Sequence, residues 1–264
     1  MRRSLLVLTA ALAVCTGCRD NPHAVRWPFV RTQPVSANQL MAAVNRTYAS
    51  APSYADEGVV ITTFHSDHLF TSRKPFTTQF SRGGPFRYEF RDRFLYASTH
   101  FVVWTERGAV DSWWTVIPRI ERFRTIADAL DGPSGVSGGS AHTIPTLLLG
   151  NAGRGWRITN LRNAVIVGEQ SLPPYGRCFV VQGTHPRQAR MFRIWIDQRS
   201  LAILRIYDRS RLDSTTEVEE TTIYKPRFDV AIDVSKIHFT PPRQLTLPGG
   251  CGIDLPKWLS WLAA

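Results

Sequence analysis

His65, Asp67 and His68 lie within four residues of one another, and imidazole and carboxylate groups are ligands that zinc takes. A zinc site needs three or four ligands that converge on one point. The preceding residues are rich in β-branched and aromatic types, which predicts a strand here. In an extended strand, residues three apart point to opposite faces, so His65 and His68 diverge. A polar hairpin end therefore explains these residues better than a metal site, and we expect no metal and no other cofactor.

Serine, histidine and aspartate all occur, but the signal for nucleophilic hydrolysis is missing. No G-x-S-x-G elbow is present. The Gly- and Ser-rich stretch 134–140 lacks the lysine of a phosphate-binding loop, so a flexible loop that could open a cavity is the better interpretation. We assign no catalytic residue and expect the chain not to be an enzyme.

Cys18 ends an N-terminal segment that is typical of exported proteins. Two arginines precede an apolar run of about ten residues, which is too short for a bilayer, since spanning takes about 20. The letters ALA at 11–13 fit a plain signal peptide, whereas TGC at 16–18 resembles the lipobox of bacterial lipoproteins. We predict a signal peptide over 1–17 and lipidation of Cys18, as with palmitate. The acyl chains would hold the protein on the outer membrane of the cell envelope, facing the periplasm.

Cys178 and Cys251 are the two cysteines beyond this segment. Two cysteines in an exported domain suggest a disulfide. A bridge that closes a loop of about 73 residues would contribute about 4 kcal/mol in the chain-entropy model. Two buried thiols are the alternative.

The composition describes a basic globular protein. The chain has 264 residues, 43% of them hydrophobic, and a formal net charge of +11. A basic chain could bind nucleic acid, an anionic membrane or an acidic partner. The arginines are scattered through strand-like segments, without a basic helix, zinc-finger spacing or an RNP-like aromatic motif. Nucleic acid is therefore excluded as a partner.

The chain alternates between strand-like and helix-like stretches. Residues 18–35 hold three prolines and predict an extended tether. Ser36 and Gln39 form a capping box for a helix that ends before Pro52. Strands follow to 117, then an amphipathic helix over 117–132 and a short apolar helix capped by Gly150. Five more strands complete a domain over 36–248, and 249–264 forms a C-terminal tail.

This order predicts an α+β fold. A long antiparallel meander either closes into a barrel or curls around something. With helices inserted in mid-chain, we expect a curled antiparallel half-barrel sheet of about ten strands, with helices covering its concave face.

Three segments carry a resemblance to a known family. MFRIWIDQRSLAILRIYD at 191–208 pairs an aromatic-x-Ile-Asp turn with a returning apolar strand. TTIYKPRFDVAIDVSKIHFTPP at 221–242 leads from Tyr-x-Pro to Pro-Pro, and YASAPSYADEGVVITTF at 48–64 joins a helix to a strand. In this order they resemble the LolA/LolB-like periplasmic lipoprotein carriers. The resemblance implies a half-open β-barrel whose helices lid an apolar cavity.

That resemblance implies binding of a hydrophobic ligand, such as an acyl chain, a lipid or a lipoprotein, without catalysis. The alternative is a protein-interaction or envelope-stress regulatory module with an envelope protein partner. Apolar side chains that could line the cavity are concentrated in two places, and ordinary core packing is the competing interpretation. The strand residues are Phe101, Trp104, Trp113 and Trp114, and the lid residues are Ile144, Leu147 and Leu148.

Overall fold

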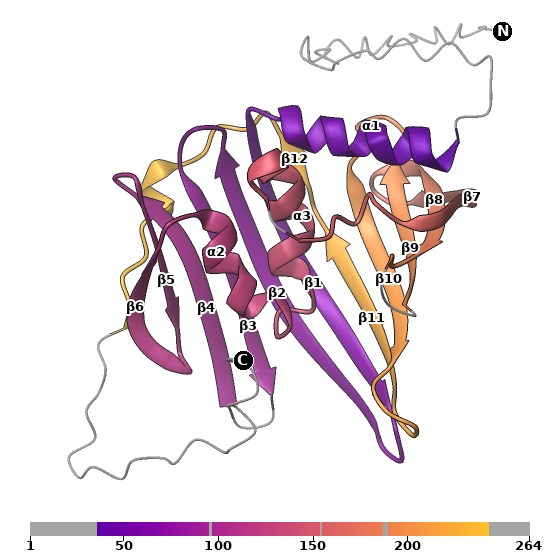
Figure 1. The fold of residues 1–264 in the computed structure, drawn as a ribbon, viewed down its shortest axis with the longest axis horizontal. Coiled ribbons are helices and arrows are strands. Elements are labelled where there is room, and N and C mark those ends of the chain that lie inside the picture. The colour runs from indigo at the N-terminus through magenta and orange to yellow at the C-terminus, as the bar shows by residue number, and fades with distance from the viewer. Residues whose placement is uncertain (1–35, 95–96, 154, 187–189, 243–264) are drawn as a thin grey trace, which may run out of the picture. The chain divides into compact units, whose positions relative to one another are not determined.

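The computed structural model describes residues 36–94, 97–153, 155–186 and 190–242, all within one compact unit that begins at Val35 (Figure 1). The predicted signal peptide, tether and tail lie outside the described residues and stay predictions. The helices are α1 (Ala37–Ser50), α2 (Ile126–Asp131) and α3 (Ser140–Leu149). The strands are β1 (Ser53–His65), β2 (Leu69–Ser81), β3 (Phe86–Phe94), β4 (Ala97–Glu106), β5 (Ala109–Trp114), β6 (Ile117–Phe123), β7 (Arg162–Leu172), β8 (Gly176–Thr184), β9 (Met191–Asp197), β10 (Ile203–Arg211), β11 (Glu217–Tyr224) and β12 (Arg227–Phe228).

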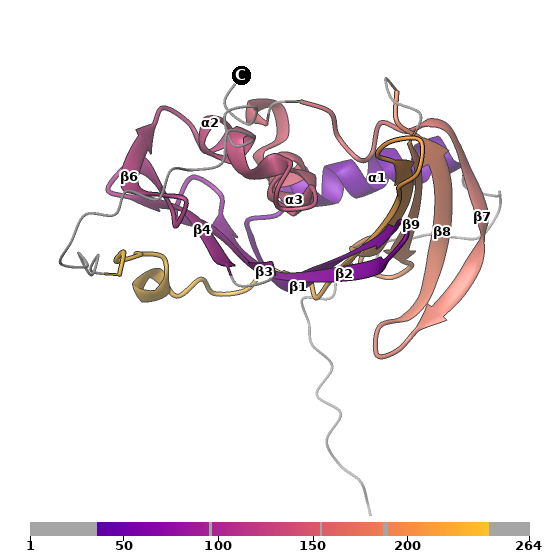
Figure 2. The same ribbon diagram turned by 90° about the horizontal axis from the view of Figure 1, so that it is seen from below.

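The strands form one antiparallel sheet that is curled but not closed, as Figure 2 shows. The spatial order is β6-β5-β4-β3-β2-β1-β11-β10-β9-β8-β7, and β12 pairs with β1. The sheet thus consists of two meanders, which meet where β1 pairs with β11 and Gly58 lies opposite Tyr224. The described residues contain twelve strands, somewhat more than the predicted ten, because the segment after Trp114 and the two residues of β12 add strands.

Helix α1 forms as its capping box predicts. The Ser36 backbone N–H donates to Gln39 Oε1 at 3.0 Å, and the Gln39 N–H donates to Ser36 Oγ at 3.2 Å. Leu40, Val44 and Tyr48 recur at i, i+4 and i+8 and are 2% exposed or less. This face packs into the main hydrophobic core, which also contains inward-facing residues of the strands.

The segment 117–123 corrects the predicted helix over 117–132. It forms strand β6, in which Ile120 pairs with Trp113 of β5. Within the predicted helix, only Ile126–Asp131 is α-helical. Thr125 caps that helix by accepting a hydrogen bond from the Asp128 backbone N–H. The apolar spacing of Ile120 and Phe123 suits a helix, but the open ladder of β5 offers backbone hydrogen bonds to the whole segment. Tertiary pairing therefore overrides the local pattern.

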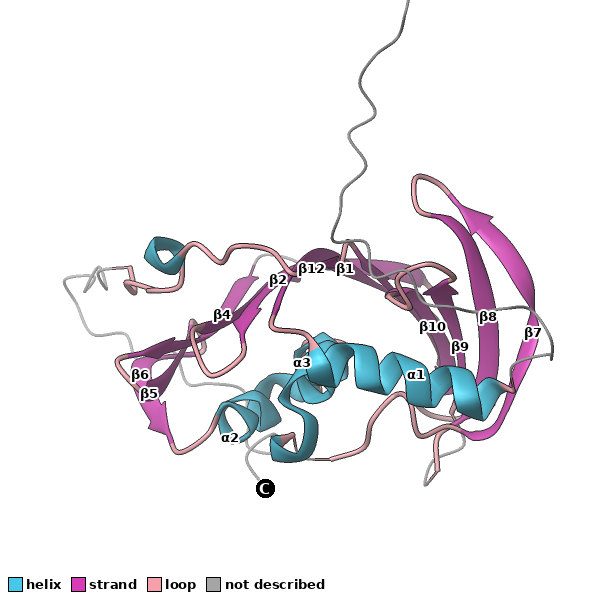
Figure 3. Ribbon diagram, turned by 90° about the horizontal axis from the view of Figure 1, so that it is seen from above, coloured by secondary structure: helices cyan, strands magenta, loops and turns pink. Residues whose placement is uncertain are grey.

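The α-helices α1, α2 and α3 lie on one side of the sheet, whereas the short 3₁₀ helix Val234–Lys236 lies on the other (Figure 3). α3 is the apolar helix that the sequence predicts, and Gly150, with φ of 57°, ends it by donating its N–H to the Leu147 carbonyl. Ile144, Leu147 and Leu148 of this helix are fully buried. The helices and the sheet thus form two layers with an apolar interior between them.

Candidate functional site

The interior layer between α3 and the sheet is the first candidate for a ligand site. Ile144, Leu147 and Leu148 belong to the same buried cluster as Phe101 of β4. Trp114, which lies opposite Phe101 in the ladder, is partly buried and packs against this cluster. Five of the seven predicted cavity residues therefore share one apolar layer.

Trp104 and Trp113 do not belong to that layer, which corrects the prediction that all seven residues line one space. Side chains alternate between the two faces of a strand. Phe101 and Trp104 are three positions apart on β4, so their side chains point to opposite faces of the sheet. Trp113 pairs with Val102 on the same outer face. Both indoles are at most 4% exposed and form a second cluster with Val102 and Ile237.

The outer cluster is buried by a C-terminal strap, which we define as residues 229–242. Phe239 of the strap lies 5.5 Å from the Trp104 ring and 5.4 Å from the Trp113 ring, measured between centroids. The guanidinium of Arg87 on β3 donates hydrogen bonds to the Lys236 and His238 carbonyls at 2.9 and 3.0 Å. The strap therefore completes the core of the outer face, where the sequence pattern had indicated a cavity.

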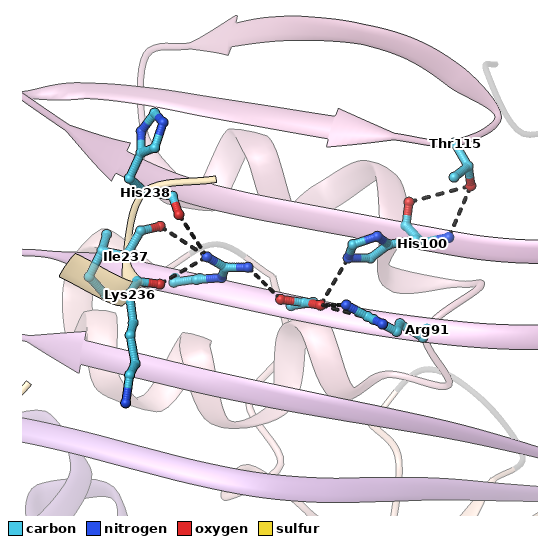
Figure 4. A network of polar contacts seen from close by, with 8 residues as sticks. Arg91, His100, Thr115, Lys236, Ile237 and His238 are labelled. Atoms are coloured by element: carbon cyan, nitrogen blue, oxygen red, sulfur yellow. Dashed lines mark hydrogen bonds and ion pairs between the residues drawn. The ribbon is translucent and has the colours of Figure 1, made fainter. Parts of the chain in front are cut away.

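A charged network holds Arg87 in place beneath the strap. Figure 4 labels its strap partners Lys236 and His238, and the residues His100 and Arg91 at the other end of the network. Arg87 Nη2 donates to Glu89 Oε2 at 2.6 Å, and His100 Nε2 lies 2.9 Å from Glu89 Oε1. Burial raises the pKa of Glu89, but the hydrogen bonds from His100 and Arg87 outweigh it and lower the pKa to about 2. Glu89 is therefore an anion that orients the arginine toward the strap.

The interior layer contains polar groups that the sequence analysis did not identify. The Tyr88 and Ser140 hydroxyls are 2.7 Å apart, which ties the start of α3 to β3. The Tyr54 hydroxyl donates to Asp56 Oδ2 at 2.8 Å. Burial raises the pKa of Asp56 to about 7, against the opposing effect of hydrogen bonds from Tyr54 and Thr78.

A second ionic group lies on β10 and β11. Arg190 forms a bidentate pair with Asp208, at 2.7 and 2.8 Å, and lies 3.6 Å from Glu220. Thr62 donates to Glu220 at 3.2 Å. Burial raises the pKa of Asp208 and of Glu220, and in Glu220 the neighbouring Asp208 charge adds to the effect. Only the strand register brings these residues together, so spacing along the sequence could not have found them.

The segment 134–140, predicted as a flexible loop, packs against the sheet. Ser137 and Ser140 are at most 1% exposed. A Cβ added to Gly138 would lie 2.6 Å from Val60 Cγ1 and 2.7 Å from Glu220 Oε2. The backbone of Gly138 also has a positive φ, of +62°. Only glycine combines that close approach with that backbone conformation.

His65, Asp67 and His68 lie at the β1–β2 hairpin end, as predicted, and are exposed. His65 Nε2 is 3.5 Å from Glu219 of β11. Within the described residues, no three His, Cys, Asp or Glu side chains are grouped so that they could hold a metal ion.

The two predicted cysteine sites are only partly within the described residues. Cys178 lies on β8 as a buried thiol, and burial raises its pKa to about 11. Cys18 and Cys251 lie outside the described residues, so lipidation and the disulfide stay predictions. No helix in the described part of the chain has both the length and the apolarity to cross a bilayer.

No protein-family model matches this chain, and no curated protein matches it in sequence. A comparison with solved structures does find similar chains. LprF from Mycobacterium bovis matches with a TM-score of 0.43 and 9% identity, over 75% of this chain and 95% of LprF. The Pseudomonas aeruginosa MucA/MucB complex matches with a TM-score of 0.41 and 12% identity, over 77% of this chain and 61% of the matched one.

A LolA-superfamily protein from Nitrosomonas europaea matches with a TM-score of 0.33 and 10% identity, over 78% of this chain and 99% of that protein.

Proposed function

We propose that this chain is an envelope lipoprotein, anchored through acylated Cys18, whose domain binds an apolar ligand without catalysis. The ligand is an acyl chain, a lipid or a lipoprotein. In this proposal the helices cover the concave face of the sheet, and the ligand enters between α3 and that face. α3 moves away from the sheet as the ligand enters.

The observation that carries the proposal is the apolar layer under α3. The side chains of Ile144, Leu147 and Leu148 are buried in this layer and contain only apolar atoms. An acyl chain that takes the place of these side chains against the strands keeps the same apolar surface out of water, so the exchange loses little hydrophobic free energy. The Tyr88–Ser140 hydrogen bond is a polar contact that must break for the start of α3 to leave β3.

A titration with cis-parinaric acid tests this proposal. We expect saturable binding with energy transfer from tryptophan. Tyr88→Phe keeps the ring and removes the hydroxyl tie, so it should speed association. Tyr207→Phe is the control. It removes a hydroxyl that donates a hydrogen bond to Glu219 and does not contact α3, so it should leave the association rate unchanged. If the folded protein binds none of several acyl ligands saturably, the proposal fails.

The anchor has its own test. Cys18→Ser should abolish incorporation of radiolabelled palmitate and release the protein from the membrane fraction. Labelling and membrane retention equal to those of the unchanged chain would contradict the lipoprotein assignment.

The edge strands favour a second candidate, the interaction or regulatory module. Val165 and Val167 of edge strand β7 are 52% and 49% exposed. An edge strand presents unpaired backbone groups to which a partner's strand can add. A photo-cross-linking residue at position 167 that captures one defined envelope protein, while the same residue at the exposed position 73 captures none, would favour this module.

A further inference from the structure

A groove of about 540 Å³ lies between α1 and the segment 159–161 that leads into β7. Asn38, Asn45 and Arg46 of α1 line one wall of the groove. Asn45 and Arg46 follow Asn38 by seven and eight residues, so the three lie on one side of the helix. Thr159 and Asn160 face them from the other wall. The volume falls within the range of about 300–1,000 Å³ that is typical of small-molecule sites.

The polar side chains of this groove have no partners among the described residues. Asn45 Oδ1 and Thr159 Oγ1 are both buried atoms without a hydrogen bond. A buried polar atom left unsatisfied costs about 1–3 kcal/mol, so a polar group from outside the chain is expected to meet them. The Arg46 guanidinium is exposed and forms no ion pair with any described residue.

The charge around the groove favours an anion. Arg46 is the one ionised residue in its lining. The whole of α1 lacks Asp and Glu, and so does the stretch 132–168 that supplies the opposite wall. No carboxylate in either segment therefore competes for Arg46 or repels a negative ligand.

We propose that this groove binds a glycerophosphate-type group, a phosphate ester that carries free hydroxyls. Arg46 pairs with the phosphate, as guanidinium groups do in bidentate geometry. Rotation of the Asn45 and Thr159 side chains toward the groove exposes Oδ1 and Oγ1, which then accept hydrogen bonds from the hydroxyls. Met41 and Leu161, also in the lining, contact the carbon backbone of the ligand. The assignment does not depend on an apolar ligand under α3.

Such a group has two sources, a phospholipid headgroup and a free phosphate ester. The experiment measures binding of sn-glycerol 3-phosphate by calorimetry, with glycerol as the uncharged comparison. A parallel arm measures binding to phosphatidylcholine vesicles with and without phosphatidylglycerol. The variants are Arg46→Gln and Thr159→Val. Arg73→Gln is the matched control, because it removes an exposed arginine from β2, outside the groove.

We expect saturable binding of the phosphate ester or of the phosphatidylglycerol vesicles, and none of glycerol. Arg46→Gln should weaken binding roughly 10- to 100-fold, the usual effect of losing a charge-assisted hydrogen bond, and Arg73→Gln less than twofold. Binding of the free ester identifies a soluble ligand, and Arg46-dependent binding of vesicles alone identifies a headgroup. Absence of binding in both arms, or equal weakening by Arg46→Gln and Arg73→Gln, overturns the proposal.

Discussion

The backbone N–H of Ile203 donates a hydrogen bond to the phenol oxygen of Tyr48 at 3.0 Å, across 155 positions of the chain. The β9–β10 ladder shifts register between Ile203 and Arg205. Tyr48, at the end of α1, thus satisfies a buried donor beside an irregularity of the sheet.

Tyr48→Phe should therefore destabilise the fold by about 1–3 kcal/mol, because the buried Ile203 N–H loses its acceptor. Denaturant unfolding monitored by circular dichroism measures the change. Tyr207→Phe, with a half-buried hydroxyl, is the control and should cost less. Equal losses in the two variants would mean that the Tyr48 bond contributes nothing specific.

Asp56 predicts a stability that falls with rising pH. Its pKa of about 7 in the folded state lies above the ordinary 3.8, because burial penalises the anion. The folded state therefore holds the proton more tightly than the unfolded state, and stability is lost as pH rises from about 4 to 7. Asp56→Asn can still accept the hydrogen bond from Tyr54 but carries no charge.

We expect Asp56→Asn to be more stable than the unchanged chain at pH 8, by on the order of 1.4 kcal/mol for each unit of pKa shift that it removes. The gain should shrink at pH 4.5. Arg227, whose charge opposes the shift, stays in both proteins. Urea unfolding at the two pH values checks this, and a gain that does not change with pH would contradict it.

Glu89 predicts that the stability of the fold falls as pH falls, the opposite of the effect of Asp56. Its pKa of about 2 is depressed below the ordinary 4.5, so it stabilises the fold above pH 4.5 and this contribution is lost as pH falls toward 2. Glu89→Gln should lose less stability than the unchanged chain between pH 5 and pH 2.5. Unfolding curves at these pH values, with exposed Glu57→Gln as control, make the comparison. Identical acid sensitivity of Glu89→Gln and the unchanged chain would refute the assignment.

The strap predicts a fluorescence change. Phe239→Ala removes the ring that covers Trp104 and Trp113, so water should reach these indoles and shift tryptophan emission to the red. Leu212→Ala, which truncates an exposed side chain elsewhere, should leave the spectrum unchanged. An unshifted spectrum in Phe239→Ala would mean that the ring does not keep water from the outer cluster.

The cysteine pair remains a prediction with a direct chemical test. Peptide mapping without reductant, on protein prepared from the periplasm, should find Cys178 linked to Cys251. Because the Cys178 side chain is buried, a bridge there would hold the end of the chain against β8. Two free thiols would establish the alternative.

Local signals predicted the elements that are fixed by local hydrogen bonds. The Ser36–Gln39 box and Gly150 mark real helix ends, since each satisfies backbone groups within its own turn. The apolar face of α1 followed from periodicity, and α3 was predicted from its apolar composition as a short helix that ends at Gly150. The antiparallel meander followed because consecutive strands are joined at hairpin distance.

What the sequence could not predict depends on distant partners. The spacing of Trp104 and Trp113 does not reveal which face the helices cover, and only the strap position explains their burial. The joining of β1 to β11, which places Thr62 beside Glu220, has no local signal. The groove polar groups were missed because Asn45 and Thr159 lie on segments that are more than 100 residues apart.

The pairing of the first strand with β11 has a consequence for how the molecule is made. Each meander can form from neighbouring hairpins as the chain emerges, but the seam between Gly58 and Tyr224 needs residues from both ends of the domain. Contacts this distant in sequence slow folding and leave intermediates exposed. Until the last strand is synthesised, β1 remains an unprotected edge, and that interval is when a chaperone or a misdirected copy of the same chain can capture it.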